Sequence, residues 1–132
     1  MLVLTPPSNP TGSVYSKEEL VDLAKILKDT NILVVSDEMY EKLVYDKISY
    51  TPVASINDDM FQRTITINGL SKSVYMTGWR FGYLASPNKQ LISAIMKLQS
   101  QSTANVNSIT QYSAITIFNG LLDNEIEKNV TR

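Results

Sequence analysis

The sequence predicts an α/β fold in which three parallel strands and one antiparallel strand are flanked by helices. Short apolar runs of strand length recur along the chain, and helical segments with an apolar face separate several of them. One run, Ile32–Val35, is apolar throughout, which is typical of a strand covered on both faces. The connection to the last run is too compact for a helical crossover, so that strand is predicted to run antiparallel.

Size and composition favour a single soluble domain spanning residues 1–132. At this length a folded chain buries roughly two-thirds of its unfolded surface. Hydrophobic residues make up 43% and charged residues 19%, which is ordinary for globular proteins. The net charge of −1 argues against a nucleic-acid partner, because phosphate backbones are bound by clustered Lys and Arg.

The chain has neither Cys nor His, which excludes disulfides and removes the commonest metal ligand and general base. We therefore expect no metal site, and acid–base chemistry must use Lys, Tyr, Asp or Glu. No apolar run approaches the roughly 18 residues of a membrane helix. We expect no membrane association and a cytoplasmic location.

The first third contains two predicted strands and a helix. Residues 2–5 form a buried strand, and residues 6–12, with three prolines and a glycine, form an irregular turn. Asn9 lies near that strand's end, where its amide could face a ligand or simply form the turn.

Ser16 and Glu19 have capping-box spacing and begin a structural helix. Asp37 lies just past Ile32–Val35, where it could meet a cationic ligand or act as a helix N-cap. Glu38 favours the same helix dipole.

The remaining elements follow in order. Residues 41–61 are predicted to be irregular, except that Thr51-Pro52 opens a turn or a short helix. Residues 63–67 are predicted to form the third strand, and residues 81–85 the fourth. Ser86 and Pro87 have the pattern of a helix start, with Ser86 as cap. Another helix spans residues 108–118 and stops at Gly120. Four apolar residues are its predicted core: Ile109, Tyr112, Ile115 and Phe118.

The stretch 68–82 carries the strongest chemical signal. It places Lys72 just beyond the third strand and Arg80 eight residues later. A partly desolvated lysine can act as a nucleophile, and the planar guanidinium of arginine suits phosphate. Taken alone, the stretch is equally compatible with a surface Lys and a structural Arg in a glycine-containing loop.

Three motifs together resemble the class I/II aminotransferases, which are fold-type I enzymes dependent on pyridoxal phosphate (PLP). The motifs are Asn9-Pro10-Thr11-Gly12, Ser36-Asp37-Glu38-Met39-Tyr40 and Ser71-Lys72 through Thr77-Gly78-Trp79-Arg80. The resemblance covers nearly the whole chain and is closest to the aspartate and aromatic aminotransferase branch. It implies that residues 1–132 are the second half of the large, PLP-binding domain, without the N-terminal part and the small C-terminal domain.

The resemblance also implies roles for the site residues. Lys72 would bind the cofactor covalently and then carry a proton between substrate and cofactor. Asp37 would pair with the pyridinium nitrogen, while Tyr40 and Asn9 would hydrogen-bond the ring oxygen. Arg80 would hold the phosphate. Many relatives have a hydroxyl three residues before the lysine, where this chain has Gly69, so Ser71 is a weak substitute.

The implied activity is amino transfer between an aspartate-like or aromatic amino acid and a 2-oxo acid. The isolated chain is expected to be inactive, because part of the cofactor site lies outside it. Two alternatives remain: a non-catalytic truncated domain, and a PLP-dependent lyase or synthase of the same fold. An exposed sheet edge and exposed apolar faces predict a homo-oligomer.

Overall fold

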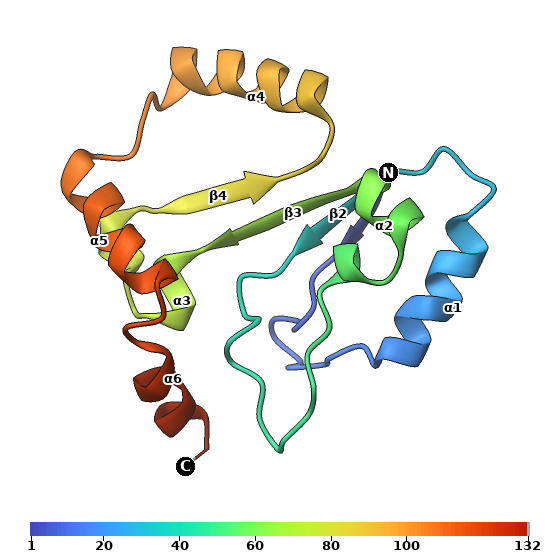
Figure 1. Cartoon of the computed structure of the whole chain (residues 1–132), viewed down its shortest axis with the longest axis horizontal. Helices are drawn as coiled ribbons and strands as arrows, with labels where there is room; N and C mark the ends of the chain where they lie inside the picture. The colour runs from blue at the N-terminus through green and yellow to red at the C-terminus, as the bar shows by residue number, and fades with distance from the viewer. Residues whose placement is uncertain (132) are drawn as a thin grey trace.

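The computed structural model describes residues 1–131, whose four strands form one sheet in the order β1-β2-β3-β4 (Figure 1). The strands are β1 (Leu2–Leu4), β2 (Val34–Asp37), β3 (Thr64–Gly69) and β4 (Gly82–Ala85). β1, β2 and β3 are parallel, with Leu2 opposite Val34 and Val34 opposite Thr64. β4 is antiparallel to β3. The predicted α/β class and the predicted antiparallel fourth strand are confirmed.

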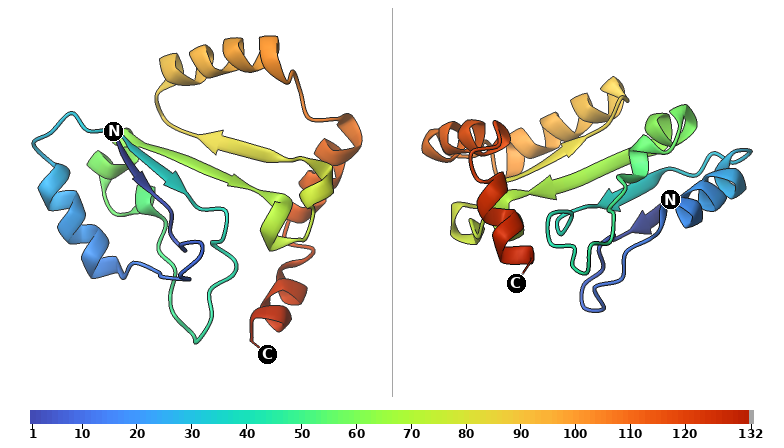
Figure 2. Two further views of the ribbon diagram at one scale, coloured as in Figure 1. Left: turned by 180° about the vertical axis from the view of Figure 1, so that it is seen from behind. Right: turned by 60° about the horizontal axis from the view of Figure 1, so that its bottom comes forward.

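Within residues 1–131, six α-helices and two 3₁₀ helices connect and flank these strands. The α-helices are α1 (Lys17–Leu27), α2 (Asp58–Arg63), α3 (Leu70–Ser73), α4 (Lys89–Ser102), α5 (Ser108–Phe118) and α6 (Asp123–Val130), and the 3₁₀ helices are η1 (Val53–Ser55) and η2 (Thr77–Trp79). Figure 2 shows α1 and α2 near β1 and β2, whereas α5 and α6 lie on the opposite side of the molecule. No helix of residues 1–131 is both long and apolar enough to cross a bilayer.

The hydrophobic core lies between α1 and the β1–β2 half of the sheet. Its buried members are Leu4, Leu20, Ala24, Leu27, Val34, Val53 and Met60. Burying a side chain of the Val or Leu type stabilises the fold by about 1.5–3 kcal/mol. The predicted capping box of α1 is present: the Ser16 hydroxyl accepts from Glu19 N at 3.2 Å, and Glu19 Oε2 accepts from Ser16 N at 2.8 Å.

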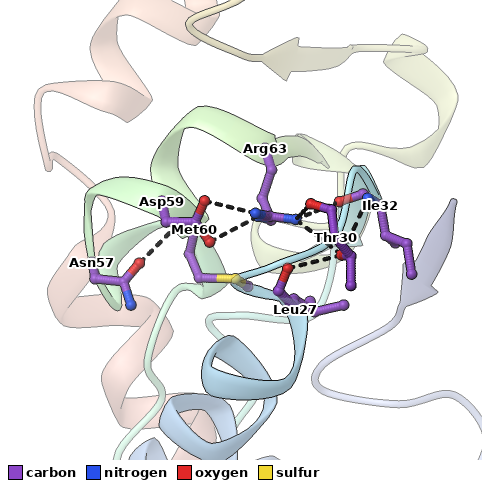
Figure 3. Close-up of polar contacts among 7 residues, drawn as sticks. All are labelled: Leu27, Thr30, Ile32, Asn57, Asp59, Met60 and Arg63. Atoms are coloured by element: carbon purple, nitrogen blue, oxygen red, sulfur yellow. Dashed lines mark hydrogen bonds and ion pairs between the residues drawn. The ribbon is translucent and has the colours of Figure 1, made fainter.

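The Arg63 side chain joins α2 to the connection between α1 and β2 (Figure 3). Its guanidinium donates to both carboxylate oxygens of Asp59, at 2.6 and 3.0 Å, and to the backbone oxygens of Thr30 and Ile32, each at 3.0 Å. Only 10% of the Arg63 side chain is exposed. This contact fixes where β2 and β3 begin relative to one another.

Several predicted boundaries were wrong. β2 begins at Val34 rather than Ile32, because Ile32 and Leu33 lie on the surface. The short helix predicted to open at Thr51-Pro52 is confirmed as η1, but the stretch 41–61 also contains most of α2, whose N-cap Asn57 accepts from Met60 N at 2.8 Å. α4 begins after Asn88, not Ser86, because the Asn88 side chain accepts from Leu91 N at 3.0 Å.

The predicted core of α5 was also wrong. Helix α5 has the predicted bounds, and Gly120 follows it with a positive φ of 83°. However, Ile109, Tyr112, Ile115 and Phe118 are all exposed, and the buried positions are Thr110 and Ala114. Apolar residues occur on all sides of α5, so their spacing did not single out the buried face.

Candidate active site

The predicted site residues lie beyond the carboxyl ends of the three parallel strands. Asn9 follows β1, Asp37 ends β2, and Ser71 and Lys72 lie on α3, which directly follows β3. Carboxyl ends of parallel strands meet at one edge of the sheet, where α/β proteins bind ligands. The parallel pairing of Asp37 with Ile67 therefore brings the β2 end beside the segment that leads to Lys72.

Three of these side chains form a continuous row. The Asn9 amide donates to the Tyr40 hydroxyl at 3.2 Å, and Lys72 Nζ lies 5.7 Å from the centroid of the Tyr40 ring. Tyr40 and Lys72 are half-buried, whereas Asn9 is exposed. The row joins residues that are 31 and 32 positions apart in sequence. Tyr40, which follows β2, therefore contacts the side chains that follow both β1 and β3.

Asp37 and Arg80 complete the charged groups of this region without forming ion pairs. Asp37 Oδ1 accepts from Met39 N at 3.2 Å, so the carboxylate is held within its own turn. Arg80 Nη1 donates to the Thr77 carbonyl at 2.9 Å, and its guanidinium is exposed. Within residues 1–131, neither they nor Lys72 form an ion pair. A carboxylate, an amine and a guanidinium are therefore free to meet a charged ligand.

The loop after Lys72 is folded back onto α3. Met76 N donates to the Leu70 carbonyl at 3.1 Å, and the Thr77 hydroxyl donates to the Ser71 carbonyl at 2.9 Å. These contacts fix the course of the chain from Lys72 to Arg80. In the part of the chain that the structure describes, the Arg80 guanidinium forms no hydrogen bond or ion pair with the other five predicted site residues.

Gly69 has a steric reason to lack a side chain. A Cβ at this position would lie 2.7 Å from the Phe81 carbonyl oxygen and 3.1 Å from Met39 Cε. Gly69 is paired with Gly82 across the antiparallel β3–β4 ladder, so the backbones approach closely. A hydroxyl-bearing residue could not replace Gly69 without moving β4.

The interpretation of Asp37 and Glu38 as the start of a helix was wrong. Residues 38–43 form turns, and no helix begins at Asp37. Glu38 is 3% exposed, and its Oε1 accepts from Ser36 Oγ at 2.9 Å and from Val53 N at 3.2 Å. Sequence reasoning missed this buried carboxylate. The available signal was a second acid directly after a buried strand, with no apolar helical pattern behind it.

Acidic residues behind the row affect nearby titrating groups. The pKa of Tyr50 is raised mainly by burial and, to a smaller extent, by the negative charge of Glu38. In the described structure the Tyr50 hydroxyl is buried without a hydrogen-bond partner of normal geometry. Burial also raises the pKa of Glu41, an effect that a hydrogen bond from Asn68 partly offsets. A cavity of about 740 Å³ lies away from the row, between residues 41–50 and α6, and none of the six predicted residues lines it.

Comparison with known proteins decides the family. The family model "Aminotransferase class I and II" matches residues 1–132. The chain belongs to the class I and II aminotransferases. It is 49% identical over 122 residues to an aspartate aminotransferase of Bacillus sp. (strain YM-2) and 46% identical over 119 residues to that of Bacillus subtilis. These stretches are 92% and 90% of this chain but only 31% and 30% of the two relatives.

Solved structures of this family agree with the observed fold. An aromatic aminotransferase from Pyrococcus horikoshii superposes with a TM-score of 0.84 at 38% identity, covering 98% of this chain and 33% of that one. An aspartate aminotransferase from Rhizobium meliloti gives 0.86 at 36% identity, covering 96% and 32%. This class I and II aminotransferase chain therefore spans about a third of the length of the relatives it matches.

The side chains present fit PLP. An amine can bind an aldehyde, and a carboxylate can pair with a protonated ring nitrogen. A phenol and an amide can hydrogen-bond a ring oxygen, and a guanidinium suits a phosphate. The observed row supplies the phenol of Tyr40 with the amide of Asn9 on its hydroxyl and the amine of Lys72 beside its ring. Asp37 and Arg80 supply the charges, both free of ion pairs within residues 1–131.

Proposed function

We propose that the chain is the part of a PLP-dependent aminotransferase that carries the cofactor-binding lysine. The parent protein would transfer an amino group between an aspartate-like or aromatic amino acid and a 2-oxo acid. The observation that carries this proposal is the contact row Asn9–Tyr40–Lys72 in a chain that matches the aminotransferase family over its full length. Residues 1–132 would be the second half of the large domain.

Each residue has a role suited to its position. Lys72 would bind the cofactor through Nζ and then move a proton to and from the substrate Cα. Tyr40 and Asn9, already hydrogen-bonded, would orient the ring oxygen, and Asp37 would keep the ring nitrogen protonated. Arg80 would bind the phosphate once its guanidinium turns from the Thr77 carbonyl, with Ser71 as a weaker donor. PLP, when bound, supplies the electron sink for the reaction.

The isolated chain is proposed to be inactive in amino transfer. It spans only 31% of the first Bacillus relative, and the Asn9 and Arg80 side chains are open to solvent. An open site does not exclude the water that weakens electrostatic interactions. A homo-oligomer and a cytoplasmic location remain predictions from the sequence.

A chimera tests the proposed function. Residues 1–132 would replace the aligned part of the Bacillus sp. (strain YM-2) aspartate aminotransferase, to which 122 residues are 49% identical. We expect the chimera to transfer amino groups from aspartate to a 2-oxo acid, and Lys72→Ala to abolish this. The matched control is Lys89→Ala, a change at an exposed lysine on α4. A folded chimera with no aminotransferase activity on any amino acid would contradict the proposal.

A further inference from the structure

We propose that Glu38 is a positioning residue that holds the turn of residues 37–40, and with it the Tyr40 ring, against Lys72. The inference rests on the proposed function, since it concerns the side chains that would meet the cofactor. Its basis is geometric. Glu38 lies between Asp37 and Tyr40 in sequence, yet its side chain is buried and directed away from the solvent.

The Glu38 carboxylate links two separate parts of the chain. Its Oε1 accepts from Ser36 Oγ at 2.9 Å, within β2, and from Val53 N at 3.2 Å, at the start of η1. Val53 is itself fully buried in the core. The 37–40 turn is therefore anchored through Glu38 to the hydrophobic core.

The backbone of the same turn is fixed at its other side. Glu38 N donates to the Ile67 carbonyl of β3 at 2.8 Å, and Glu41 N donates to the Glu38 carbonyl at 3.0 Å. The Leu43 N–H donates to the Tyr40 carbonyl at 2.8 Å. These backbone bonds set the height of the turn above the sheet. The side-chain bond from Val53 N sets its tilt, because it joins the turn to the start of η1.

Removing the carboxylate leaves two buried donors unpaired. Both Ser36 and Val53 are 0% exposed, so water cannot replace the lost acceptor without opening the core. A buried unpaired donor costs about 1–3 kcal/mol, and the backbone can recover part of it by shifting the turn toward solvent. Such a shift moves Tyr40 away from Lys72 and Asn9. A glutamine at position 38 retains an acceptor oxygen of the same reach.

The test uses nuclear Overhauser contacts in the 132-residue chain without cofactor. In the wild type we expect a contact between the Tyr40 ring and the Lys72 side-chain methylenes, and slow exchange of the Val53 amide. Glu38→Ala should lose the contact and speed Val53 exchange about tenfold, the equivalent of about 1.4 kcal/mol. Glu38→Gln should preserve both. Ser16→Ala, which breaks the cap of α1, controls for a general loss of stability and should also preserve both.

The outcomes separate the positioning role from a structural one. Retention of the Tyr40–Lys72 contact in a folded Glu38→Ala variant would overturn the inference. If Glu38→Ala does not fold, Glu38→Asp decides: its shorter carboxylate should weaken the contact, and an unchanged contact would equally overturn the inference. PLP binding by the chimera is measured separately. A chimera that binds no PLP contradicts the proposed function, whereas the contact data still decide the role of Glu38.

Discussion

The Tyr40 ring lies 5.7 Å from Lys72 Nζ while its hydroxyl accepts from Asn9, so a single aromatic side chain contacts both other strand ends. Its ring and its hydroxyl thus have different partners. A cation near an aromatic face gains about 0.5–1 kcal/mol at an exposed site, and the hydroxyl adds a hydrogen bond of similar size. The two contributions can be separated by substitution.

Tyr40→Phe tests the hydroxyl alone. The ring remains beside Lys72, whereas the bond from Asn9 and any bond to a cofactor oxygen are lost. We expect the dissociation constant of the chimera for PLP to rise about tenfold, the equivalent of one hydrogen bond to a charged group. Absorbance titration measures it, with Tyr45→Phe, at an exposed tyrosine outside the row, as the control. Equal affinity in the two variants would exclude a cofactor contact of the Tyr40 hydroxyl.

Arg63→Lys tests the contact that joins α2 to the start of β2. Lysine keeps the charge but cannot donate simultaneously to Asp59, Thr30 and Ile32. We expect the free energy of unfolding to fall by about 2 kcal/mol, measured by urea denaturation. Arg80→Lys, the same change at an exposed arginine, should stay within about 0.5 kcal/mol of the wild type. Similar losses in both variants would contradict the structural role of Arg63.

Glu41→Gln tests a half-buried acidic group behind the row. Burial raises the pKa of Glu41 in the folded state, so the unfolded chain ionises first as pH rises. The stability contributed by this group is therefore present below the unfolded pKa of about 4.3 and lost as pH rises through the folded pKa. Glutamine avoids that loss.

We accordingly expect Glu41→Gln to be more stable than the wild type at pH 7, with the difference disappearing near pH 4. Urea denaturation at the two pH values measures this. The control is Glu127→Gln at an exposed glutamate of α6, which should have little effect at either pH. A Glu41→Gln variant that is less stable than the wild type at pH 7 would refute the assignment.

The exposed apolar residues of α4 and α5 predict self-association. Leu98 is 72% exposed, Ile109 69% and Tyr112 77%. Large apolar side chains exposed on neighbouring helices are available to an interaction surface. We expect the apparent mass in light scattering to increase with protein concentration, and the double variant Ile109→Lys, Tyr112→Glu to reduce that increase. A monomer at all concentrations would argue against it.

The sequence was informative where local chemistry determines structure. Ser16 and Glu19 defined a cap that depends on four consecutive residues, and the short link between Lys72 and Phe81 defined the direction of β4. It was misleading where burial depends on distant partners. Ile109, Tyr112 and Ile115 of α5 stay exposed, whereas Phe118 lies against Tyr83 of β4. Glu38 is buried because Val53, fifteen residues away, supplies its donor.

The same distinction applies to the candidate site. Asn9, Tyr40 and Lys72 were proposed from their motifs, and parallel pairing of the strands brings them into contact. The Arg80 guanidinium bonds its own loop instead, because a flexible side chain on an exposed turn takes the nearest carbonyl. The motif gave the position of this residue along the chain but not the direction of its side chain.

The most direct measurement is to locate the lysine that binds PLP. The chimera would be loaded with PLP, reduced with borohydride to make the lysine linkage permanent, digested and mapped by mass spectrometry. We predict that the label lies on the peptide containing Lys72 and is absent in Lys72→Ala. A label on any other lysine, or no label on a folded chimera, would contradict the assignment of Lys72.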